Sequence, residues 1–208
     1  MYVKNWFNKK FEYIYLNETI KDSLEMIHEN RECIVVLRHD NTLYNIIRYE
    51  DIEFLGNFDE SKEIYEVLDP VDIFLYNDDL IEDAMLMMLE NKVKIFPVVD
   101  HEMFPVGIFG FYEIIKAFRS LSSMEEDGTK IMLIRDDIPG ELKRLLDIVS
   151  KEDINILSLM THKIKNKKRI ITLKINIKDV SFVSDLFDKN DIDYEAIFEE
   201  EASIWNNY

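Results

Sequence analysis

The feature that most constrains the fold of this chain is a pattern of short apolar runs that occurs twice. In residues 94–116, KIFPVVDHEMFPVGIFGFYEIIK, two apolar runs (95–99 and 106–109) flank a polar turn, and an amphipathic segment follows from residue 111. Short apolar runs bounded by turn residues are typical of strands that are buried on both faces. The sequence therefore predicts a strand–turn–strand–helix unit here.

The same order of segments occurs earlier in the chain. Residues 33–37 and 43–47 predict two strands around a turn, and residues 49–55 predict a helix. Each unit is preceded by a short helix, a strand and a longer helix. In the first copy they are expected at 3–7, at 11–16 and from Asn17 or Thr19 to about residue 30, and in the second copy at 64–68, 73–76 and 80–91. A repeat this long predicts a duplicated domain rather than a solenoid of many short units.

The pattern changes after residue 121. Residues 122–129 (SSMEEDGT) are polar and acidic, and they predict a linker. Beyond them the chain predicts the order βαββαβ, the ferredoxin-like plan, with strands at 131–135, 154–161, 170–177 and 194–198 and helices at 141–151 and 181–189. Residues 200–208 form an acidic tail.

Composition excludes several classes of function. The net charge of −17 disfavours nucleic acid or an anionic membrane as a partner, because both require clustered Lys and Arg. Cys33 is the sole cysteine, so a disulfide framework is excluded and a reducing cytoplasm is the expected compartment. No N-terminal signal is visible, and no apolar run approaches the roughly 20 residues of a membrane helix. The four histidines share no ligand spacing, so no metal site is predicted. No phosphate loop or nucleophile motif predicts an enzyme.

At this point the residues support a resemblance to known families. The repeats resemble tandem cystathionine-β-synthase (CBS) domains, through IFPVVD and PVGIFGFYEIIKAF in the second copy and CIVVLRHDNTLYNIIRYEDI in the first. Residues 130–199 resemble an ACT domain through DDIPGEL and DINILSL. This order of domains resembles the acetoin utilisation protein B family. The expected fold is α+β: two CBS-type βαββα repeats (1–60 and 61–121), the linker 122–129, a ferredoxin-like ACT domain (130–199) and the tail 200–208.

The resemblance implies an adenosine nucleotide site between the two CBS copies. In the family, an Asp that closes the strand–helix motif accepts hydrogen bonds from ribose, and a hydroxyl residue three positions earlier faces phosphate. The matching acidic residues are Asp51 and Glu113. Arg48 and Gly110 replace the hydroxyl residue. Arg48 would be a bidentate phosphate partner, and Gly110 would offer only its backbone N–H.

The resemblance also implies where the adenine ring would lie and which ligands would bind. The adenine is expected against backbone and apolar side chains near Ile34, Val35, Phe96 and Pro97, with Tyr15 and Tyr76 at the strand edge. The expected regulatory ligands are AMP, ADP, ATP or S-adenosylmethionine, and no cofactor is expected. The alternative is a degenerate cleft in which Arg48 is solvated and pairs with a carboxylate. Of the two clefts, the one with Arg48 and Asp51 is favoured.

For the ACT domain the resemblance implies a small-metabolite pocket at a dimer interface. Asp137 and Asn155 stand where the family places two asparagines that contact an amino acid, and Gly140 allows close backbone approach. The alternatives are that Asp137 caps the helix that starts near Pro139 and that Asn155 lies in a turn. For Asp137 the helix cap is the favoured interpretation.

These expectations combine into two hypotheses about function. The first is a non-catalytic cytoplasmic sensor that binds an adenine nucleotide or adenosyl ligand in the CBS pair and an amino acid or small metabolite in the ACT domain, and thereby modulates a partner protein of unknown identity. The second is a constitutive interaction or assembly module with degenerate ligand sites. A homodimer, or alternatively a tetramer, is expected through the apolar helix 111–121.

Overall fold

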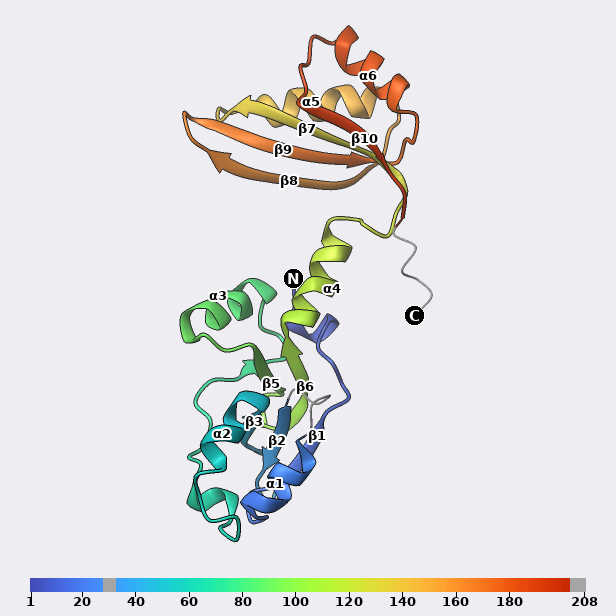
Figure 1. The fold of residues 1–208 in the computed structure, drawn as a ribbon. Helices are drawn as coiled ribbons and strands as arrows, with labels where there is room; N and C mark the ends of the chain where they lie inside the picture. Colours follow the sequence, from blue (N-terminus) through green and yellow to red (C-terminus); the bar gives the residue numbers. More distant parts are fainter. Residues whose placement is uncertain (28–32, 203–208) are drawn as a thin grey trace. The chain divides into compact units, whose positions relative to one another are not determined.

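The computed structural model describes residues 1–27 and 33–202 (Figure 1). The chain forms two compact units, Met1–Lys116 and Ala117–Tyr208, and the division falls within helix α4 (Phe111–Leu121). Among the described residues, no helix is both long and apolar enough to cross a membrane. The end of the first predicted helix and most of the predicted tail (203–208) lie outside the described residues.

The first unit contains two three-stranded sheets of the same topology. The strand orders are β1-β2-β3 and β4-β5-β6, and in each sheet the first pair is parallel and the second antiparallel. The strands are β1 (Glu12–Tyr15), β2 (Cys33–Leu37), β3 (Leu43–Arg48), β4 (Leu75–Tyr76), β5 (Ile95–Val99) and β6 (Pro105–Gly110), with helices α1 (Ile20–Met26), α2 (Ile52–Leu55) and α3 (Ile81–Asn91). The predicted duplication is therefore seen as two motifs with one connectivity.

Strand register makes the two motifs equivalent residue by residue. Cys33 pairs with Arg48 in the first sheet, and Ile95 pairs with Gly110 at the same place in the second. Both hairpins also carry a register shift at the corresponding point, before Leu37 and before Val99. Arg48 and Gly110 therefore occupy equivalent positions at the end of the last strand.

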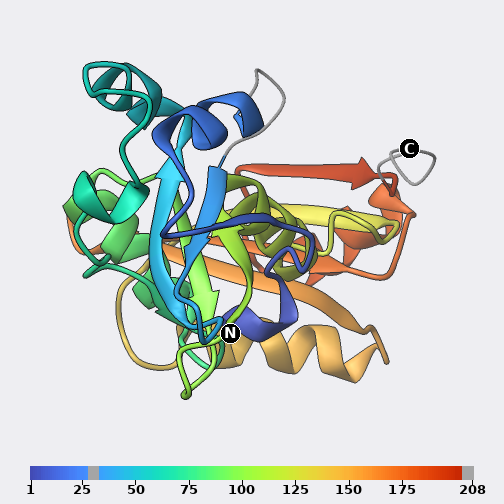
Figure 2. The same cartoon turned by 90° about the horizontal axis from the view of Figure 1, so that it is seen from below.

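The central strands are buried on both faces, as their apolar sequences predict. On one face of β2, Ile34 and Val36 pack in a core with Ile20 of α1 and Leu55 of α2. On its other face, Val35 belongs to a second cluster that joins the two sheets, whose members are Cys33, Val35, Leu37, Leu43, Ile46, Ile95, Val99 and Ile108. Figure 2 shows the strands of the first motif (blue) alongside those of the second (green).

The two motifs exchange their opening segments. The 3-10 turn η1 (Val3–Asn5) precedes the first motif, but its first backbone N–H donates to the carbonyl of Asp79 in the second motif (2.8 Å). The turn η3 (Ile64–Glu66) precedes the second motif, but its first N–H donates to the carbonyl of Glu18 in the first motif (2.9 Å). Because each motif is closed by a segment of the other, the pair forms one compact unit.

The start of helix α1 follows local capping chemistry. Of the two candidate caps for α1, Thr19 is the one used: its side chain accepts from the backbone of Asp22, and the Asp22 carboxylate accepts from the backbone of Thr19. This reciprocal arrangement is a capping box. The helix predicted at 49–55 forms instead as a 3-10 turn, η2 (Tyr49–Asp51), followed by the single turn of α2.

The second unit has the βαββαβ order that the sequence predicts. Its sheet has the order β10-β7-β9-β8 with antiparallel pairs, and Figure 1 shows α5 and α6 on one face of that sheet. The elements are β7 (Gly128–Asp136), α5 (Glu141–Lys151), β8 (Ile156–Ile164), β9 (Lys168–Ile175), α6 (Val180–Lys189) and β10 (Ala196–Glu200). Its core includes Leu133, Leu173, Val149 and Phe187, which are all fully buried.

A buried polar network closes one end of this second unit. Lys174, in β9, is fully buried, and its Nζ lies 3.0 Å from a carboxylate oxygen of Glu200 and donates to the carbonyl of Ser123 (2.9 Å). The Ser123 hydroxyl donates to the carbonyl of Leu157 (2.8 Å). The Lys130 ammonium is a second partner of Glu200. Part of the segment predicted as a linker is therefore packed onto the sheet.

Candidate functional site

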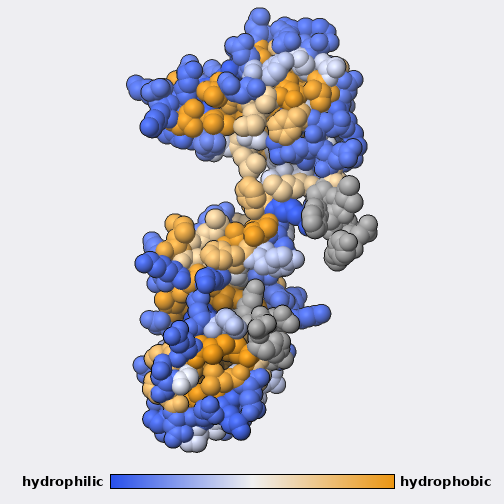
Figure 3. Space-filling model, viewed as in Figure 1, coloured by the Kyte–Doolittle hydropathy of each residue, from blue (hydrophilic) through white to orange (hydrophobic). Residues whose placement is uncertain are grey.

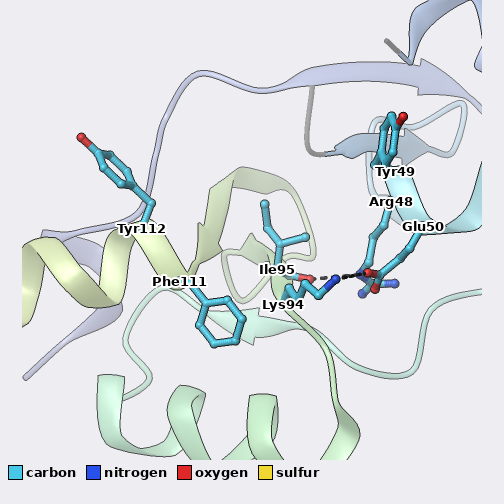
Figure 4. Close-up of a pocket in the computed structure, with 7 residues that line it drawn as sticks. All are labelled: Arg48, Tyr49, Glu50, Lys94, Ile95, Phe111 and Tyr112. Carbon is cyan, nitrogen blue, oxygen red and sulfur yellow. Dashed lines mark hydrogen bonds and ion pairs between the residues drawn. The ribbon is translucent and has the colours of Figure 1, made fainter. Parts of the chain in front are cut away.

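A cavity of about 260 Å³ lies between the two motifs of the first unit (Figure 4). Its walls come from the end of β3, the start of β5 and the first turn of α4. The lining residues are Arg48, Tyr49, Glu50, Lys94, Ile95, Phe111 and Tyr112. Because both motifs contribute to it, the cavity depends on their pairing.

Arg48 holds a fixed position in this cavity. It lies two residues after Ile46 on β3, so strand alternation places its side chain on the face that meets the other motif. Its Nε donates to the carbonyl of Ile95 in the second motif (3.2 Å). Within the described part of the chain its two Nη groups have no hydrogen-bond partner. The guanidinium is therefore oriented by one bond and keeps two nitrogen groups for an anion.

A second contact between the motifs lies beside Arg48. The Lys94 ammonium donates to the Glu50 carboxylate at 2.8 Å. Figure 4 shows these two side chains and Arg48 meeting near the Ile95 carbonyl. The cavity thus contains two cationic groups and one anionic group at close range.

Aromatic rings form the apolar part of the site. Phe111 and Tyr112, at the start of α4, and Tyr49, at the start of η2, each expose about half of their surface or more. In Figure 4 the ring of Phe111 lies on the side of Lys94, whereas the ring of Tyr112 points away from the charged groups. An exposed ring next to fixed cations can stack on a planar base while the cations hold an anion.

The two acidic residues of the motifs occupy equivalent positions and make equivalent bonds. Asp51 accepts from the backbone N–H of Arg48 (2.8 Å), and Glu113 accepts from that of Gly110 (3.0 Å). Glu113 is buried and pairs with Lys116 (3.1 Å). The idea that the Gly110 N–H remains available to an anion is wrong, because the Glu113 carboxylate already accepts its hydrogen bond.

The four strand residues expected near adenine lie inside the sheets. Ile34, Val35 and Phe96 are fully buried, and Pro97 is buried in the same strand as Phe96. None of them lines the cavity. They occupy the middle of β2 and β5, where both faces are covered by other side chains, whereas the cavity opens at the strand ends.

Tyr15 and Tyr76 lie at the opposite end of their sheets from the cavity. Tyr15 pairs with Leu37, four residues along β2 from the Cys33 position opposite Arg48, a separation of about 13 Å at the usual rise per residue. Its hydroxyl donates to Asn41 (2.9 Å). Tyr76 stacks on His101 with ring centroids 5.1 Å apart. The structure does not bring these two tyrosines together with Arg48.

Several residues that line the cavity escaped the sequence prediction. Each is a neighbour of a predicted residue: Tyr49 and Glu50 follow Arg48, Lys94 and Ile95 precede Phe96, and Phe111 and Tyr112 follow Gly110. Their shared signal is a position at, or just beyond, the end of a strand. That signal could have found them, since ligands in sheets with helical layers bind beyond the strand ends.

In the second unit, Asp137 does not cap helix α5. The helix begins at Glu141 after Gly140, whose φ of 101° suits glycine, and Gly140 provides no side-chain cap. The Asp137 carboxylate instead accepts from Arg169 (3.0 Å) and lies 3.6 Å from Lys163. The hydrogen bond from Arg169 lowers the pKa of the Asp137 carboxyl below its ordinary value. The prediction of a helix cap is therefore wrong.

Asn155 lies at the other end of this sheet from Asp137. Its backbone N–H donates to the side chain of Asn176 (2.9 Å), just before β8 begins. Asp137 follows the end of β7, where Lys168 opens β9, whereas Asn155 lies near the end of β9. Within one chain the three predicted ACT ligand residues are therefore not brought together; Gly140 alone lies near Asp137.

Comparisons with known proteins give a family match to the second motif. The CBS domain family model matches residues 64–120. Over 110 residues the chain is 32% identical to homoserine O-acetyltransferase from Methanococcus vannielii, covering 51% of this chain and 22% of that protein. Over 124 residues it is 23% identical to the uncharacterized protein MJ1004 from Methanocaldococcus jannaschii, covering 58% of each. The chain thus spans less than two thirds of each of these relatives.

Two solved structures resemble the first unit in fold. The crystal structure of MJ1004 aligns with a TM-score of 0.52 and 23% identity over 61% of this chain and 62% of that chain. The CBS domain pair of protein MJ0100, in complex with 5′-methylthioadenosine and S-adenosyl-L-methionine, aligns with a TM-score of 0.50 and 23% identity over 57% and 95%. Residues 64–120 therefore match the CBS domain family, within a unit that has the fold of a CBS domain pair.

Proposed function

We propose that this protein is a non-catalytic regulator whose CBS pair binds an adenine nucleotide or related adenosyl ligand in the cavity around Arg48. The observation that carries the proposal is the Arg48 guanidinium, which is held across the two motifs by Ile95 and keeps both Nη groups for an anion. Phe111, Tyr112 and Tyr49 supply rings for a base. Asp51, next to the cavity, is the group proposed to contact ribose.

The size of the cavity and the structural relatives support this class of ligand. Ligand sites of about 300–1,000 Å³ are usual for small molecules, so a cavity of about 260 Å³ suits a mononucleotide or nucleoside better than a dinucleotide. The similar CBS pair of MJ0100 is in complex with 5′-methylthioadenosine and S-adenosyl-L-methionine. The ligands proposed here are therefore AMP, ADP, ATP or S-adenosylmethionine.

The second unit is proposed to be an ACT domain that binds an amino acid or another small metabolite. Its βαββαβ order and its sheet order are consistent with that domain. Because Asp137 and Asn155 lie at opposite ends of the sheet, a pocket that uses both would need a second copy of the chain. We therefore propose a homodimer, with CBS domains at 1–60 and 61–121 and an ACT domain at 130–199, resembling the acetoin utilisation protein B family in architecture.

The surface of the first unit is consistent with self-association. Phe111, Tyr112 and Ile115 of α4 and Leu86 and Leu89 of α3 each expose more than half of their surface. Figure 3 shows apolar surface (orange) over α3 and α4 of this unit. A ligand in the cavity contacts the first turn of α4, so its binding would bias how this helix meets a partner. The single cysteine is consistent with a cytoplasmic protein.

Thermal unfolding of the whole chain with AMP, ADP, ATP, S-adenosylmethionine and NADH tests the nucleotide site. A ligand at about a hundred times its dissociation constant stabilises the fold by about 2.7 kcal/mol, which raises the midpoint by about 5–11 °C for a chain of this size. Arg48→Ala should abolish the shift. Lys62→Ala, which removes an exposed cation outside the cavity, should preserve it.

The second candidate is a constitutive interaction module with degenerate ligand sites. The observation that favours it is the second motif, where Glu113 is buried and committed to Gly110 and Lys116. If no ligand shifts the midpoint and the purified protein shows no absorbance at 260 nm beyond that of Trp and Tyr, the nucleotide site is rejected in favour of this module. The match to homoserine O-acetyltransferase covers only 22% of that protein and does not carry its activity to this chain.

A further inference from the structure

The ion pair between Glu50 and Lys94 lies in the lining of the cavity, and a contribution to folding stability does not explain why it is there. The side chains expose 45% and 67% of their surface, respectively. Exposed pairs of this kind contribute little to folding, about 0–1 kcal/mol. The pair nevertheless joins the first motif to the second within the lining of the cavity, beside the hydrogen bond from Arg48 to the carbonyl of Ile95.

The charges in the cavity change when this pair opens. With Lys94 bound to Glu50, Arg48 is the one cation in the lining that lacks a carboxylate partner among the described residues. When Lys94 leaves Glu50, two cations face the same space. A phosphate group, with up to two negative charges, can accept from both, whereas a neutral ligand gives Lys94 no reason to leave the carboxylate.

We propose that Glu50 is a specificity-determining residue, an internal anion that competes with the ligand for Lys94. A phosphate-bearing adenosyl ligand displaces Glu50 from Lys94. A ligand without phosphate binds with the ion pair intact. The site thereby separates phosphate-bearing ligands such as AMP from the uncharged 5′-methylthioadenosine, and only the phosphate-bearing ligands remove this contact between the motifs. This inference rests on the proposed function, because it requires an adenosyl ligand in this cavity.

Isothermal titration of the whole chain with AMP and with 5′-methylthioadenosine tests the competition. Glu50→Gln should tighten AMP binding by about two- to fivefold, because the competing ion pair is exposed and weak. It should leave the affinity for 5′-methylthioadenosine unchanged. Lys94→Gln should weaken AMP binding by about tenfold or more, through loss of a charged hydrogen bond. In the Lys94→Gln background, Glu50→Gln should have no further effect.

A matched control separates this local effect from the overall charge. Glu53→Gln removes the same charge from an exposed position on α2, outside the cavity, and should leave AMP affinity unchanged. If Glu50→Gln weakens AMP binding, or alters AMP and 5′-methylthioadenosine equally, the competition is refuted. If the unmodified chain binds neither compound, the proposed function fails and this inference with it. If Arg48→Ala abolishes AMP binding while Glu50→Gln changes nothing, the proposed function stands and this inference alone fails.

Discussion

The buried ion network of the second unit gives the prediction with the largest expected effect. Glu200→Gln removes the one carboxylate that faces both Lys174, which is fully buried, and Lys130, which is 14% exposed. Removing one partner of a buried ion pair costs about 3–5 kcal/mol, since the remaining charge is buried without compensation. The Glu200 side chain retains 24% exposure, so we expect a loss near the lower end, about 3 kcal/mol.

Thermal and denaturant unfolding of the second unit measure this loss. For a domain of fewer than about 100 residues, 1 kcal/mol corresponds to about 4–8 °C, so the midpoint should fall by about 12–24 °C. The carbonyl of Ser123 still accepts from Lys174, but a neutral acceptor does not balance a charge. If Glu200→Gln lowers the free energy of unfolding by less than about 1 kcal/mol, the network behaves as an exposed pair and the argument is refuted.

Two variants serve as controls for this prediction. Asp147→Asn breaks an exposed pair with Lys143 on α5 and should cost less than about 0.5 kcal/mol. Lys174→Met replaces the buried cation with an apolar chain of similar length. In the Lys174→Met background, Glu200→Gln should lower the free energy of unfolding much less than it does in the unmodified chain. The reason is that Lys130 is then the one described partner that Glu200 still has.

Three further predictions concern a glycine of the first unit, the oligomeric state and the pH dependence of the Glu200 network. Gly107→Ala should destabilise the first unit by about 1–3 kcal/mol in denaturant unfolding, because a Cβ would lie 2.3 Å from the Phe7 ring and 2.5 Å from the Asn8 carbonyl. Light scattering at micromolar concentration should give about twice the mass of one chain, and Ile115→Ser, at a 63% exposed position of α4, should shift it toward one chain. Burial alone would raise the pKa of the Glu200 carboxyl, but hydrogen bonds from Lys130 and Lys174 outweigh it and lower the pKa. Its contribution is therefore complete above the ordinary value of 4.5 and is lost as pH falls through the lower folded value, so acid titration of unfolding should show a loss that Glu200→Gln removes.

The fold could be predicted from the sequence wherever burial dictates the pattern. The run of residues 33–37 has no polar position, which fits a strand covered on both faces, and the structure places alternate members in two different cores. The repeat could be found because equivalent residues carry equivalent apolar patterns. The exchange of η1 and η3 could not, since each segment buries a single apolar residue, Val3 or Ile64, and either motif could accommodate it.

The candidate site could be predicted only in part, because its contacts join residues from both motifs. Arg48 was found from its own motif. The Lys94–Glu50 pair required the placement of one motif against the other, which no local pattern contains. At Asp137 the local preference for a helix cap lost to a nearby cation on another strand: Arg169 offers the carboxylate a charged hydrogen bond, which is stronger than one from a backbone N–H.

The two motifs share a fold and a register, yet one position makes them unequal in chemistry. Arg48 and Gly110 are equivalent in strand register, and the acidic residues three positions later make the same backbone bond in both motifs. The side chain of Arg48 reaches the carbonyl of Ile95 in the second motif. Gly110 has no side chain, so it makes no equivalent contact with the first motif. Because the backbones match, the difference in anion-binding capacity between the motifs follows from that side chain. Of the two equivalent positions, only that of the first motif therefore contributes a side chain that can hold a ligand phosphate, together with Lys94 from the second motif.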